Sequence, residues 1–341
     1  MKLPLSVLDL SPIVSGSSAS QALRNTLELG QLADRLGYAR YWLAEHHNMP
    51  AIASSAPEIM IGQVARETSR IRVGSGGIML PNHAPLRVAE AFRTLEALFP
   101  GRIDLGIGRA PGSDQVSALA LRGGNRRALL AEDFPQQLAD LFGFSEGNLP
   151  ADHPYRSVAA VPTDVPLPPV WLLGSSDYSA RLAARLGLGF AFAAHFSPHD
   201  AEAAMLIYRQ EFRPSRYLAA PRSMIAASVI CGETAQQADY LAASQDLFWV
   251  RFVTGRIEPF PSPEEALAYP YTPVERAQAA ARRAQHIIGD PVQVKEGLIA
   301  LAKRTEADEV MIVAQIHSHA ARLRSYELVA EAFGLPNFPL T

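Results

Sequence analysis

Short apolar runs typical of β-strands alternate along the whole chain with longer segments whose apolar residues recur at helical spacing. Parallel strands that are joined by helical crossovers produce this alternation. Several runs are apolar at consecutive positions, as expected for strands that are buried on both faces. Strands are predicted over residues 3–8, 39–44, 71–78, 103–108, 170–173, 189–193, 224–231 and 309–313.

The helical segments are recognised by their apolar stripes and by the residues at their ends. The clearest one covers residues 85–99, where Pro85 suits the first helical position and apolar residues recur along one face. A second is predicted over residues 19–36, and it is followed by Gly37, at a position where a left-handed residue is favoured. A third covers residues 318–333 and is expected to complete the outer layer of helices.

Strands and helices in this order predict an α/β fold, a single-domain (β/α)8 barrel over residues 1–341. An open, doubly wound sheet is the alternative, but the strand count and the uniform composition of the two halves favour closure. Residues 143–169 and 245–289 do not fit the repeat and contain many prolines, so both are expected to be long inserted loops. Because such an insertion in a barrel lies over the active-site face, residues 245–289 are the candidate lid.

The composition describes an ordinary globular protein, since 48% of its 341 residues are hydrophobic and 19% are charged. The formal net charge of −3 offers no basic surface for nucleic acid or an anionic membrane, so a small-molecule partner is expected. Cys231 is the only cysteine, which excludes an intrachain disulfide and a cysteine-based zinc site. Neither a signal-peptide pattern nor an apolar stretch of spanning length is found, and a cytoplasmic location is expected.

Candidate chemistry is sought where strands end, because the carboxyl ends of barrel strands share the active face. The second predicted strand is followed by Glu45, His46 and His47. Adjacent residues of an extended chain point to opposite sides, so at most one of the two histidines can face the pocket. Together with His317 and His319, which follow the last strand, Glu45 and His46 suggest a divalent-metal site as an alternative, although most isolated histidines are not ligands.

The fifth predicted strand ends in a run of small polar residues, Gly174, Ser175 and Ser176, and Asp177 and Ser179 follow at the start of a helix. Hydroxyl groups and free backbone N–H groups at a helix N-terminus favour an anion such as a phosphate. An ordinary N-cap by one of the serines or by Asp177 is the alternative. The carboxylate of Asp177 would oppose a phosphate if it pointed inward.

Two other strand ends carry residues suited to a ligand. Arg109 follows the fourth predicted strand, where its guanidinium can pair with a phosphate or carboxylate, and a surface ion pair is the alternative. Gly106, Gly108 and Gly112 do not have the dinucleotide-binding spacing, and no helix follows them at once, so that interpretation is rejected. The glycine-rich run at residues 74–77 permits close approach by a flat ligand, with tight packing at a barrel corner as the alternative.

Taken together, these runs resemble the bacterial luciferase-like flavin monooxygenases, and the resemblance extends over nearly the whole chain. The matching runs are residues 41–48 (Tyr-Trp-Leu-Ala-Glu-His-His-Asn), 73–85, 101–109 (Gly-Arg-Ile-Asp-Leu-Gly-Ile-Gly-Arg) and 173–179, with 308–312 ahead of the last helix. Each run is weak by itself, but their order along the chain is specific. The resemblance implies a flavoprotein with FMN as its cofactor.

The resemblance also implies roles for individual residues. His46 would face the flavin, where it would act in proton transfer and stabilise an oxygenated intermediate, and His47 is the second candidate. The family's non-proline cis peptide would fall at Ser75–Gly76. The residues implied to contact the cofactor are Ser75, Gly76, Arg109, Gly174, Ser175, Ser176 and Ser179. Among them Arg109 and the three last serines would hold the FMN phosphate.

The implied reaction starts from reduced FMN and dioxygen, which form a C4a-peroxyflavin that oxidises a small organic substrate. Residues 245–289 would protect this reaction from water as a lid. No second domain for reducing the flavin is recognised, so a separate flavin reductase is implied, and the family suggests a homodimer. Gly108 and Ser175 replace a cysteine and an acid of the light-emitting members, so light emission is not expected.

Three other functions remain alternatives. The first is a deazaflavin (F420)-dependent oxidoreductase on the same barrel, which would move hydride without oxygen. The second is a barrel that binds flavin without catalysis, and the third is a metal-dependent hydrolase that uses His46, His317 and His319. The identity of the substrate is not predicted, because the shape of the pocket depends on loops whose course the sequence does not determine.

Overall fold

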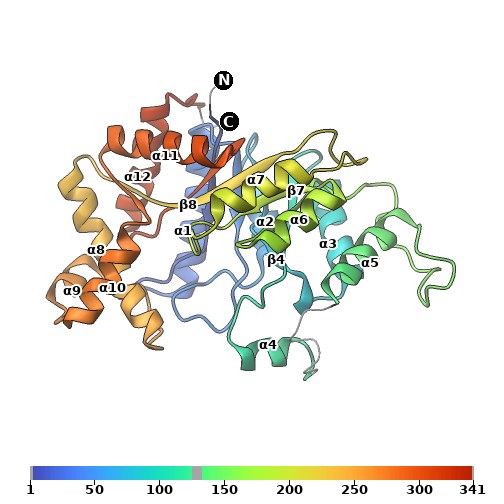
Figure 1. Cartoon of the computed structure of the whole chain (residues 1–341), viewed down its shortest axis with the longest axis horizontal. Coiled ribbons are helices and arrows are strands. Elements are labelled where there is room, and N and C mark those ends of the chain that lie inside the picture. The colour runs from blue at the N-terminus through green and yellow to red at the C-terminus, as the bar shows by residue number, and fades with distance from the viewer. Residues whose placement is uncertain (1–2, 125–132, 340–341) are drawn as a thin grey trace.

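In the computed structural model, which describes residues 3–124 and 133–339, eight parallel strands close into a barrel (Figure 1). The strands are β1 (Leu5–Asp9), β2 (Arg40–Leu43), β3 (Arg72–Ser75), β5 (Ile103–Gly108), β6 (Val170–Gly174), β7 (Gly189–Phe192), β8 (Ser223–Cys231) and β10 (Glu309–Val313). Closure is achieved by β10, which pairs with β1 on one side and with β8 on the other. The predicted (β/α)8 barrel is therefore confirmed, while residues 1–2, 125–132 and 340–341 of the predicted domain lie outside the description.

The predicted strand at residues 71–78 is divided in two. β3 ends at Ser75, and β4 (Ile78–Met79) continues the pairing with β5. A cis peptide joins Gly76 to Gly77, one residue later than the implied position at Ser75–Gly76, which is therefore wrong. Both glycines are required by close contacts, since a Cβ atom would lie 2.5 Å from Leu8 Cδ1 at Gly76 and 2.7 Å from the Gly106 carbonyl oxygen at Gly77.

The helices around the barrel start and end where their local sequences indicate. They are α1 (Ala19–Arg35), α2 (Pro57–Arg66), α3 (Pro85–Leu98), α5 (Phe134–Glu146), α6 (Asp177–Leu186), α7 (Ala201–Glu211), α11 (Pro291–Thr305) and α12 (His319–Phe333). Shorter ones are η1 (Leu80–Asn82) and α4 (Gln115–Leu121). The Ser18 side chain caps α1, Pro85 opens α3, and Gly37 has a φ of +71° just beyond α1. The three helices predicted from their stripes are found as α1, α3 and α12.

The prediction that residues 245–289 form a long loop is wrong. This segment, called the insertion below, contains the end of α8 (Ala235–Val253), α9 (Pro263–Ala268), α10 (Pro273–Arg283) and the short strand β9 (Ile287–Gly289), which pairs with β8. The prolines misled the prediction because they open α9 and α10 rather than interrupt the chain, each directly after a capping residue, Ser262 or Thr272. Residues 143–169 are different, since beyond the end of α5 they contain no helix or strand.

The strands direct alternate side chains into the barrel and towards the helices. The interior is filled by Leu8, Leu10, Trp42, Ala44, Trp171, Ala191, Met224, Ala226, Met311 and Val313. Trp42 and Trp171 meet edge to face, with ring centroids 5.7 Å apart, and form an aromatic layer across the barrel. A larger apolar cluster lies between the outer face of the strands and the surrounding helices.

The amino end of the barrel is closed by a buried network of charged side chains. Arg40 Nη1 lies 2.5 Å from Asp104 Oδ2, and Arg40 Nε lies 3.0 Å from Glu309 Oε1. Arg72 Nη2 approaches Asp104 Oδ1 at 2.7 Å, and the Trp42 indole donates to Asp104 Oδ2 at 3.1 Å. Each charge is therefore neutralised and hydrogen-bonded inside the protein, as a buried charge must be.

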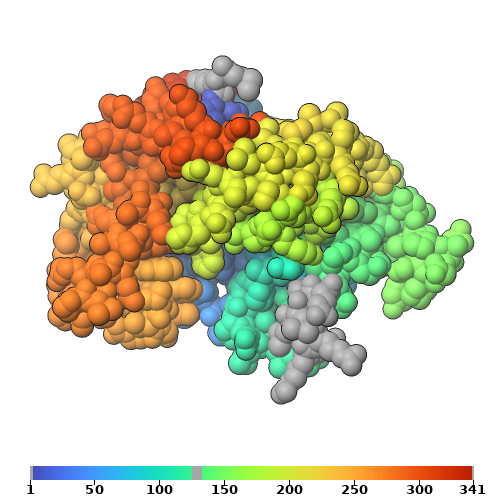
Figure 2. Space-filling view, viewed as in Figure 1, coloured from blue at the N-terminus to red at the C-terminus, as the bar shows by residue number. Residues whose placement is uncertain are grey.

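At the opposite end, the carboxyl ends of the strands form the mouth of the barrel, with α4 and the helices α9 and α10 on either side of it in Figure 1. The space-filling view shows the insertion, in gold to orange, lying against the yellow-green segment that follows β7 (Figure 2). Among the described residues no helix has both the length and the apolar character needed to cross a membrane.

Candidate active site

Two histidines lie at the carboxyl ends of their strands. Trp42 and Ala44 belong to the interior cluster, so His46, two residues further along, has the same inward parity. His195 follows β7 in a turn, where the Phe196 and Ser197 N–H groups donate to the Ala193 carbonyl oxygen at 3.2 and 3.1 Å. The two rings are close enough for the positive charge that His46 would carry to lower the pKa of His195.

His46 presents an unsatisfied ring nitrogen. Its backbone N–H donates to the Ser54 carbonyl oxygen at 2.9 Å, whereas its Nδ1 atom is buried and has no hydrogen-bond partner among the described residues. Burial lowers the pKa of His46 to about 4, an effect that the Glu45 carboxylate only partly opposes. The imidazole is therefore neutral at pH 7 and able to accept a proton at one nitrogen.

His47, the neighbouring candidate, is engaged in a separate network. Glu45 is fully buried, and its Oε1 atom lies 2.8 Å from His47 Nε2 and 2.9 Å from His83 Nε2. Its Oε2 atom accepts the backbone N–H of Met79 at 2.9 Å. Burial alone would raise the pKa of Glu45, but the hydrogen bonds from His83 and His47 hold it below its ordinary value. Glu45 thus ties the loop after β2 to the η1 region, and His47 serves that connection.

His195 is a candidate that the sequence reasoning missed. Its Nδ1 atom is buried without a partner among the described residues, and its backbone N–H donates to the Ala226 carbonyl oxygen at 2.8 Å. Burial, followed by the positive charges of His46 and Arg282, lowers the pKa of His195 to about 3. The available signal was its place two residues after the predicted strand 189–193, at the carboxyl end of a barrel strand.

The insertion also contributes to the mouth. Gln245, on α8, directs its Nε2 atom to Ser228 Oγ at 3.3 Å and to the Gln315 carbonyl oxygen at 3.5 Å. Ser228 is near the end of β8, and Gln315 follows β10. The Oε1 atom of Gln245 is buried and has no partner within the described ranges. The insertion therefore supplies a polar group to the carboxyl ends of the strands.

The start of α6 has the features of an anion site. Ser176 is the N-cap in an extended conformation, yet its side chain makes no capping hydrogen bond. Among the described residues, no hydrogen-bond partner is found for the hydroxyls of Ser175, Ser176 or Ser179. Gly174 is needed here, because a Cβ atom would lie 2.2 Å from Ser179 Oγ. The exposed carboxylate of Asp177 pairs with Arg181 on the next turn, at 3.6 Å.

Arg109 lies beside this helix start. Its guanidinium carbon is 4.2 Å from the ring centroid of Tyr178, the second residue of α6. No carboxylate pairs with Arg109 within residues 3–124 and 133–339, so the surface ion pair considered from the sequence is not found there. The fold thus brings Arg109 against Tyr178 at the start of α6, the helix start that also carries the three serines. We call Arg109, Ser175, Ser176 and Ser179 the serine–arginine site.

The other candidates for cofactor contact have a different setting. Ser75 is fully buried, and its hydroxyl donates to the Gly106 carbonyl oxygen at 2.8 Å and accepts the Gly106 N–H at 3.0 Å. At Gly76, the space where a Cβ atom would lie is filled by Leu8 and Trp42. The glycine-rich run therefore packs tightly against the barrel interior on its Cβ side, and the Ser75 hydroxyl is already used.

The residues considered for a metal site are not brought together. His317 Nε2 lies 3.1 Å from Ser15 Oγ, and His319 Nε2 lies 3.1 Å from Glu28 Oε2. Glu45 is engaged with the two histidines described above. In the part of the chain that the structure describes, no group of three or more His, Cys, Asp or Glu side chains has an arrangement that could hold a metal ion.

The sequence relationships agree with this architecture. The family model of the luciferase-like monooxygenases matches residues 3–309. The chain is 43% identical over 326 residues to a luciferase-like monooxygenase of Escherichia coli (strain K12), covering 96% of each protein. It is 34% identical over 329 residues to the N-acetyl-S-alkylcysteine monooxygenase of Bacillus subtilis (strain 168), covering 96% of this chain and 97% of that protein.

Solved structures give the same result. Apo-MsnO8 superposes with a TM-score of 0.89 at 38% identity and covers 98% of this chain and 99% of its own. Two structures below 25% identity share the fold: the oxygenating constituent of 3,6-diketocamphane monooxygenase from Pseudomonas putida, in complex with FMN (TM-score 0.72, 18% identity, 100% and 99% covered), and an F420-dependent secondary alcohol dehydrogenase (TM-score 0.70, 14% identity, 98% and 99% covered). The match over most of its length shows that this chain belongs to the luciferase-like monooxygenase family.

Proposed function

We propose that the protein is an FMN-dependent monooxygenase that uses reduced FMN and dioxygen to oxidise a small organic substrate, and that a separate flavin reductase supplies the reduced FMN. Two features of the same barrel mouth carry the proposal. His46 is a neutral histidine with an unsatisfied ring nitrogen, and the serine–arginine site has polar groups without a protein partner in the described ranges. Family membership supports the reaction class.

The serine–arginine site fits a phosphate group. A phosphate needs donors and positive charge, and the site offers three hydroxyls, the N-terminus of a ten-residue helix and one guanidinium. Asp177, the nearest acid on α6, is directed to Arg181 instead of opposing an anion. The serine–arginine site would hold the phosphate of a bound flavin mononucleotide.

The histidines would act on protons near the flavin ring. Bound reduced FMN would supply the electrons that activate dioxygen. Because the pKa of His46 lies at about 4 and that of His195 at about 3, both imidazoles are neutral at pH 7. A neutral imidazole with an unpaired Nδ1 atom can accept a proton there or donate a hydrogen bond, depending on its tautomer. Gln245 and the insertion would exclude water from this space, which is the role proposed for a lid.

The relatives guide the choice of test substrate. One of them is named for oxidation of N-acetyl-S-alkylcysteine, so a small thioether is the first probe for this chain. Of the two distant structures, one is in complex with FMN and the other is an F420-dependent enzyme, so both cofactors should be compared. A homodimer and a cytoplasmic location stay predictions.

The deciding experiment combines binding and oxygen transfer. Photoreduced FMN is mixed with the protein, a thioether and isotopically labelled dioxygen, and the products are analysed by mass spectrometry. The proposal expects one labelled oxygen atom in the organic product and FMN binding that is tighter than F420 binding. Hydride transfer from reduced F420 without oxygen consumption, together with no label in any product, would contradict it and favour the deazaflavin alternative.

A further inference from the structure

Arg282, near the end of α10, makes an unusual set of contacts with the barrel. Its Nη2 atom donates to the carbonyl oxygen of His195 at 2.6 Å, and its Nη1 atom donates to the carbonyl oxygen of Phe196 at 3.0 Å. The guanidinium carbon lies 4.5 Å from the ring centroid of Trp249 on α8. Nη1 also reaches Gln285 Oε1 at 3.1 Å. The insertion therefore contacts the backbone of the very residue whose side chain lies at the mouth.

No carboxylate lies within ion-pair distance of Arg282 in the described part of the chain. Its charge is balanced instead by two carbonyl dipoles and the face of an indole ring. The adjacent Arg283 shows the ordinary arrangement, since it pairs with Asp239 at 2.8 Å and Asp246 at 2.6 Å, both on α8. Arg283 thus holds the insertion together, whereas Arg282 connects it to the loop between β7 and α7.

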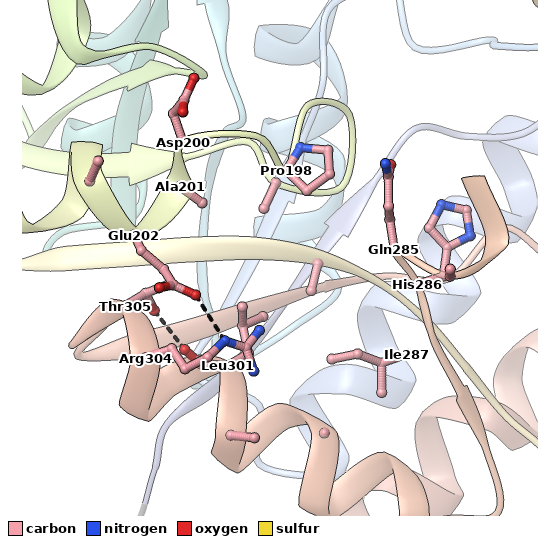
Figure 3. A pocket seen from close by; sticks show the side chains of 16 residues that line it. Pro198, Asp200, Ala201, Glu202, Gln285, His286, Ile287, Leu301, Arg304 and Thr305 are labelled. Atoms are coloured by element: carbon pink, nitrogen blue, oxygen red, sulfur yellow. Dashed lines mark hydrogen bonds and ion pairs between the residues drawn. The ribbon is translucent and has the colours of Figure 1, made fainter. Parts of the chain in front are cut away.

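The loop that Arg282 contacts has little packing support. A cavity of about 570 Å³ between α7 and α11 is lined by Ala194, Pro198 and His286 (Figure 3). A second cavity, of about 360 Å³, is lined by Phe196 and Pro198 on the side of α8 and α10. The Phe196 side chain is 59% exposed. Because both pockets border this loop, side-chain packing around its carbonyl groups is incomplete.

Hydrogen bonds then determine where the loop lies. The His195 N–H is held by the Ala226 carbonyl oxygen of β8, and the His195 carbonyl is held by Arg282. The peptide group before the His195 Cα atom is thus anchored by the barrel. The one after it is anchored by the insertion and, through the Phe196 N–H, by the Ala193 carbonyl oxygen at 3.2 Å. Loss of either anchor would allow the ring to turn away from the mouth.

We propose that Arg282 is a positioning residue, which fixes the β7–α7 loop to the insertion and so holds the His195 ring in the mouth opposite His46. The inference rests on the proposed function for what His195 does there, but the fixing of the loop is independent of it. The position of His195 therefore depends, through Arg282, on the insertion being packed against the barrel.

The first test measures backbone protection. Hydrogen exchange of the whole protein is followed by mass spectrometry in Arg282→Ala, Arg282→Lys and the matched control Arg283→Ala. Arg282→Ala is expected to speed exchange in residues 194–199 by about tenfold or more, because local opening no longer breaks two hydrogen bonds. Arg282→Lys, which keeps the charge but cannot span both carbonyls, should give an intermediate increase. Arg283→Ala should speed exchange in α8 and α10 and leave residues 194–199 unchanged.

The second test asks whether the loop matters for the flavin. Photoreduced FMN is reoxidised by dioxygen in the presence of each variant, and FMN binding is measured by fluorescence. Arg282→Ala should change the reoxidation rate in the same direction as His195→Gln, with an FMN dissociation constant within about threefold of the parent value, because the serine–arginine site is untouched. The Lys variant should restore part of the parent rate.

The outcomes separate the two ideas. Unchanged exchange in residues 194–199 of both Arg282 variants overturns the proposal, and so does an equal increase in Arg283→Ala. If Arg282→Ala does not fold, the Lys variant decides by the same criterion. Exchange that responds as expected, together with reoxidation that is insensitive to His195→Gln, supports the fixing of the loop and contradicts the role proposed for His195.

Discussion

The two ends of the barrel differ in whether their buried polar atoms have hydrogen-bond partners. At the amino end, Arg40, Asp104 and Glu309 are buried and form ion pairs with one another, and none of the three has a buried side-chain atom without a partner. At the carboxyl end, His46 and His195 each have a buried ring nitrogen without a partner in the described ranges. Native proteins satisfy nearly all buried polar groups, so a satisfied network indicates a structural role and an unsatisfied group indicates a place for a ligand.

The layer between the two ends keeps them apart. Trp42 and Trp171 cross the barrel between the charged network and the mouth, and Trp42 uses its indole N–H to bind Asp104. The inward side chains of β2 and the residues after it pass through all three layers. Arg40 belongs to the charged network, Trp42 to the aromatic layer, and His46 to the mouth. One strand therefore contributes to stability at its start and to the candidate chemistry just beyond its end.

The largest effect is expected from breaking the closed end. Asp104→Ala would leave Arg40, Arg72 and the Trp42 indole without their shared acceptor, at a cost of about 3–5 kcal/mol in the free energy of unfolding. Urea unfolding followed by circular dichroism measures it. The exposed pair of Asp177 and Arg181 is the control, and Asp177→Ala should cost less than about 0.5 kcal/mol. Similar small losses in both variants would remove the distinction between the two ends.

The next effect is expected at the mouth, on activity instead of stability. His46→Asn should lower oxygen-dependent turnover by about 10²-fold to 10⁴-fold, because a positioned proton acceptor is lost, while the free energy of unfolding changes little. His47→Gln is the matched neighbouring variant. It should lower the free energy of unfolding, because the contact with Glu45 is lost, and it should reduce turnover less than His46→Asn does. Turnover and urea unfolding are measured on both. A larger loss of turnover in His47→Gln would exchange the roles assigned to the two histidines.

A third comparison concerns the serine–arginine site. Arg109→Ala should raise the FMN dissociation constant about 10-fold to 100-fold, equivalent to about 1.5–3 kcal/mol, because a charge-assisted contact to the phosphate is lost. Arg109→Lys should give an intermediate value, and Tyr178→Phe, which keeps the aromatic ring, should leave binding nearly unchanged. Flavin fluorescence reports the binding. Equal affinity for riboflavin and FMN in the parent protein would show that this site does not hold the phosphate.

The smallest effect is expected from pH. An unfolded histidine binds a proton below about pH 6.5, whereas His46 stays neutral until about pH 4 and His195 until about pH 3. The unfolded state thus takes up more protons in this window, so the free energy of unfolding falls as the pH is lowered from 6.5 to 4, by about 1–2 kcal/mol after allowance for partial exposure of the rings. The double variant His46→Asn, His195→Asn should show a shallower decline by urea titration at each pH. An identical slope would mean that neither ring is held neutral.

The fold was largely predictable because its signals are local. Apolar runs and helical stripes marked the strands and the helices α1, α3 and α12. Period-two alternation allowed only one of His46 and His47 to face the pocket, and the family resemblance selected His46. The failures arose where local signals are ambiguous. Prolines that open α9 and α10 were interpreted as loop residues, and the cis peptide lies at Gly76–Gly77, one residue after the position that the resemblance implied.

The sequence by itself determined the eight barrel strands, the helices α1, α3 and α12 and the resemblance to the family, since these follow from short runs of residues. Only the tertiary structure decided which polar atoms are left unsatisfied. Glu45 forms hydrogen bonds with His47 and His83, and the Gly106 carbonyl oxygen accepts the Ser75 hydroxyl. Arg282 donates to the carbonyl oxygen of His195, 87 positions away in the sequence. Hydrogen-bond partners depend on contacts between distant segments, and the site consists of the polar groups that those contacts leave free.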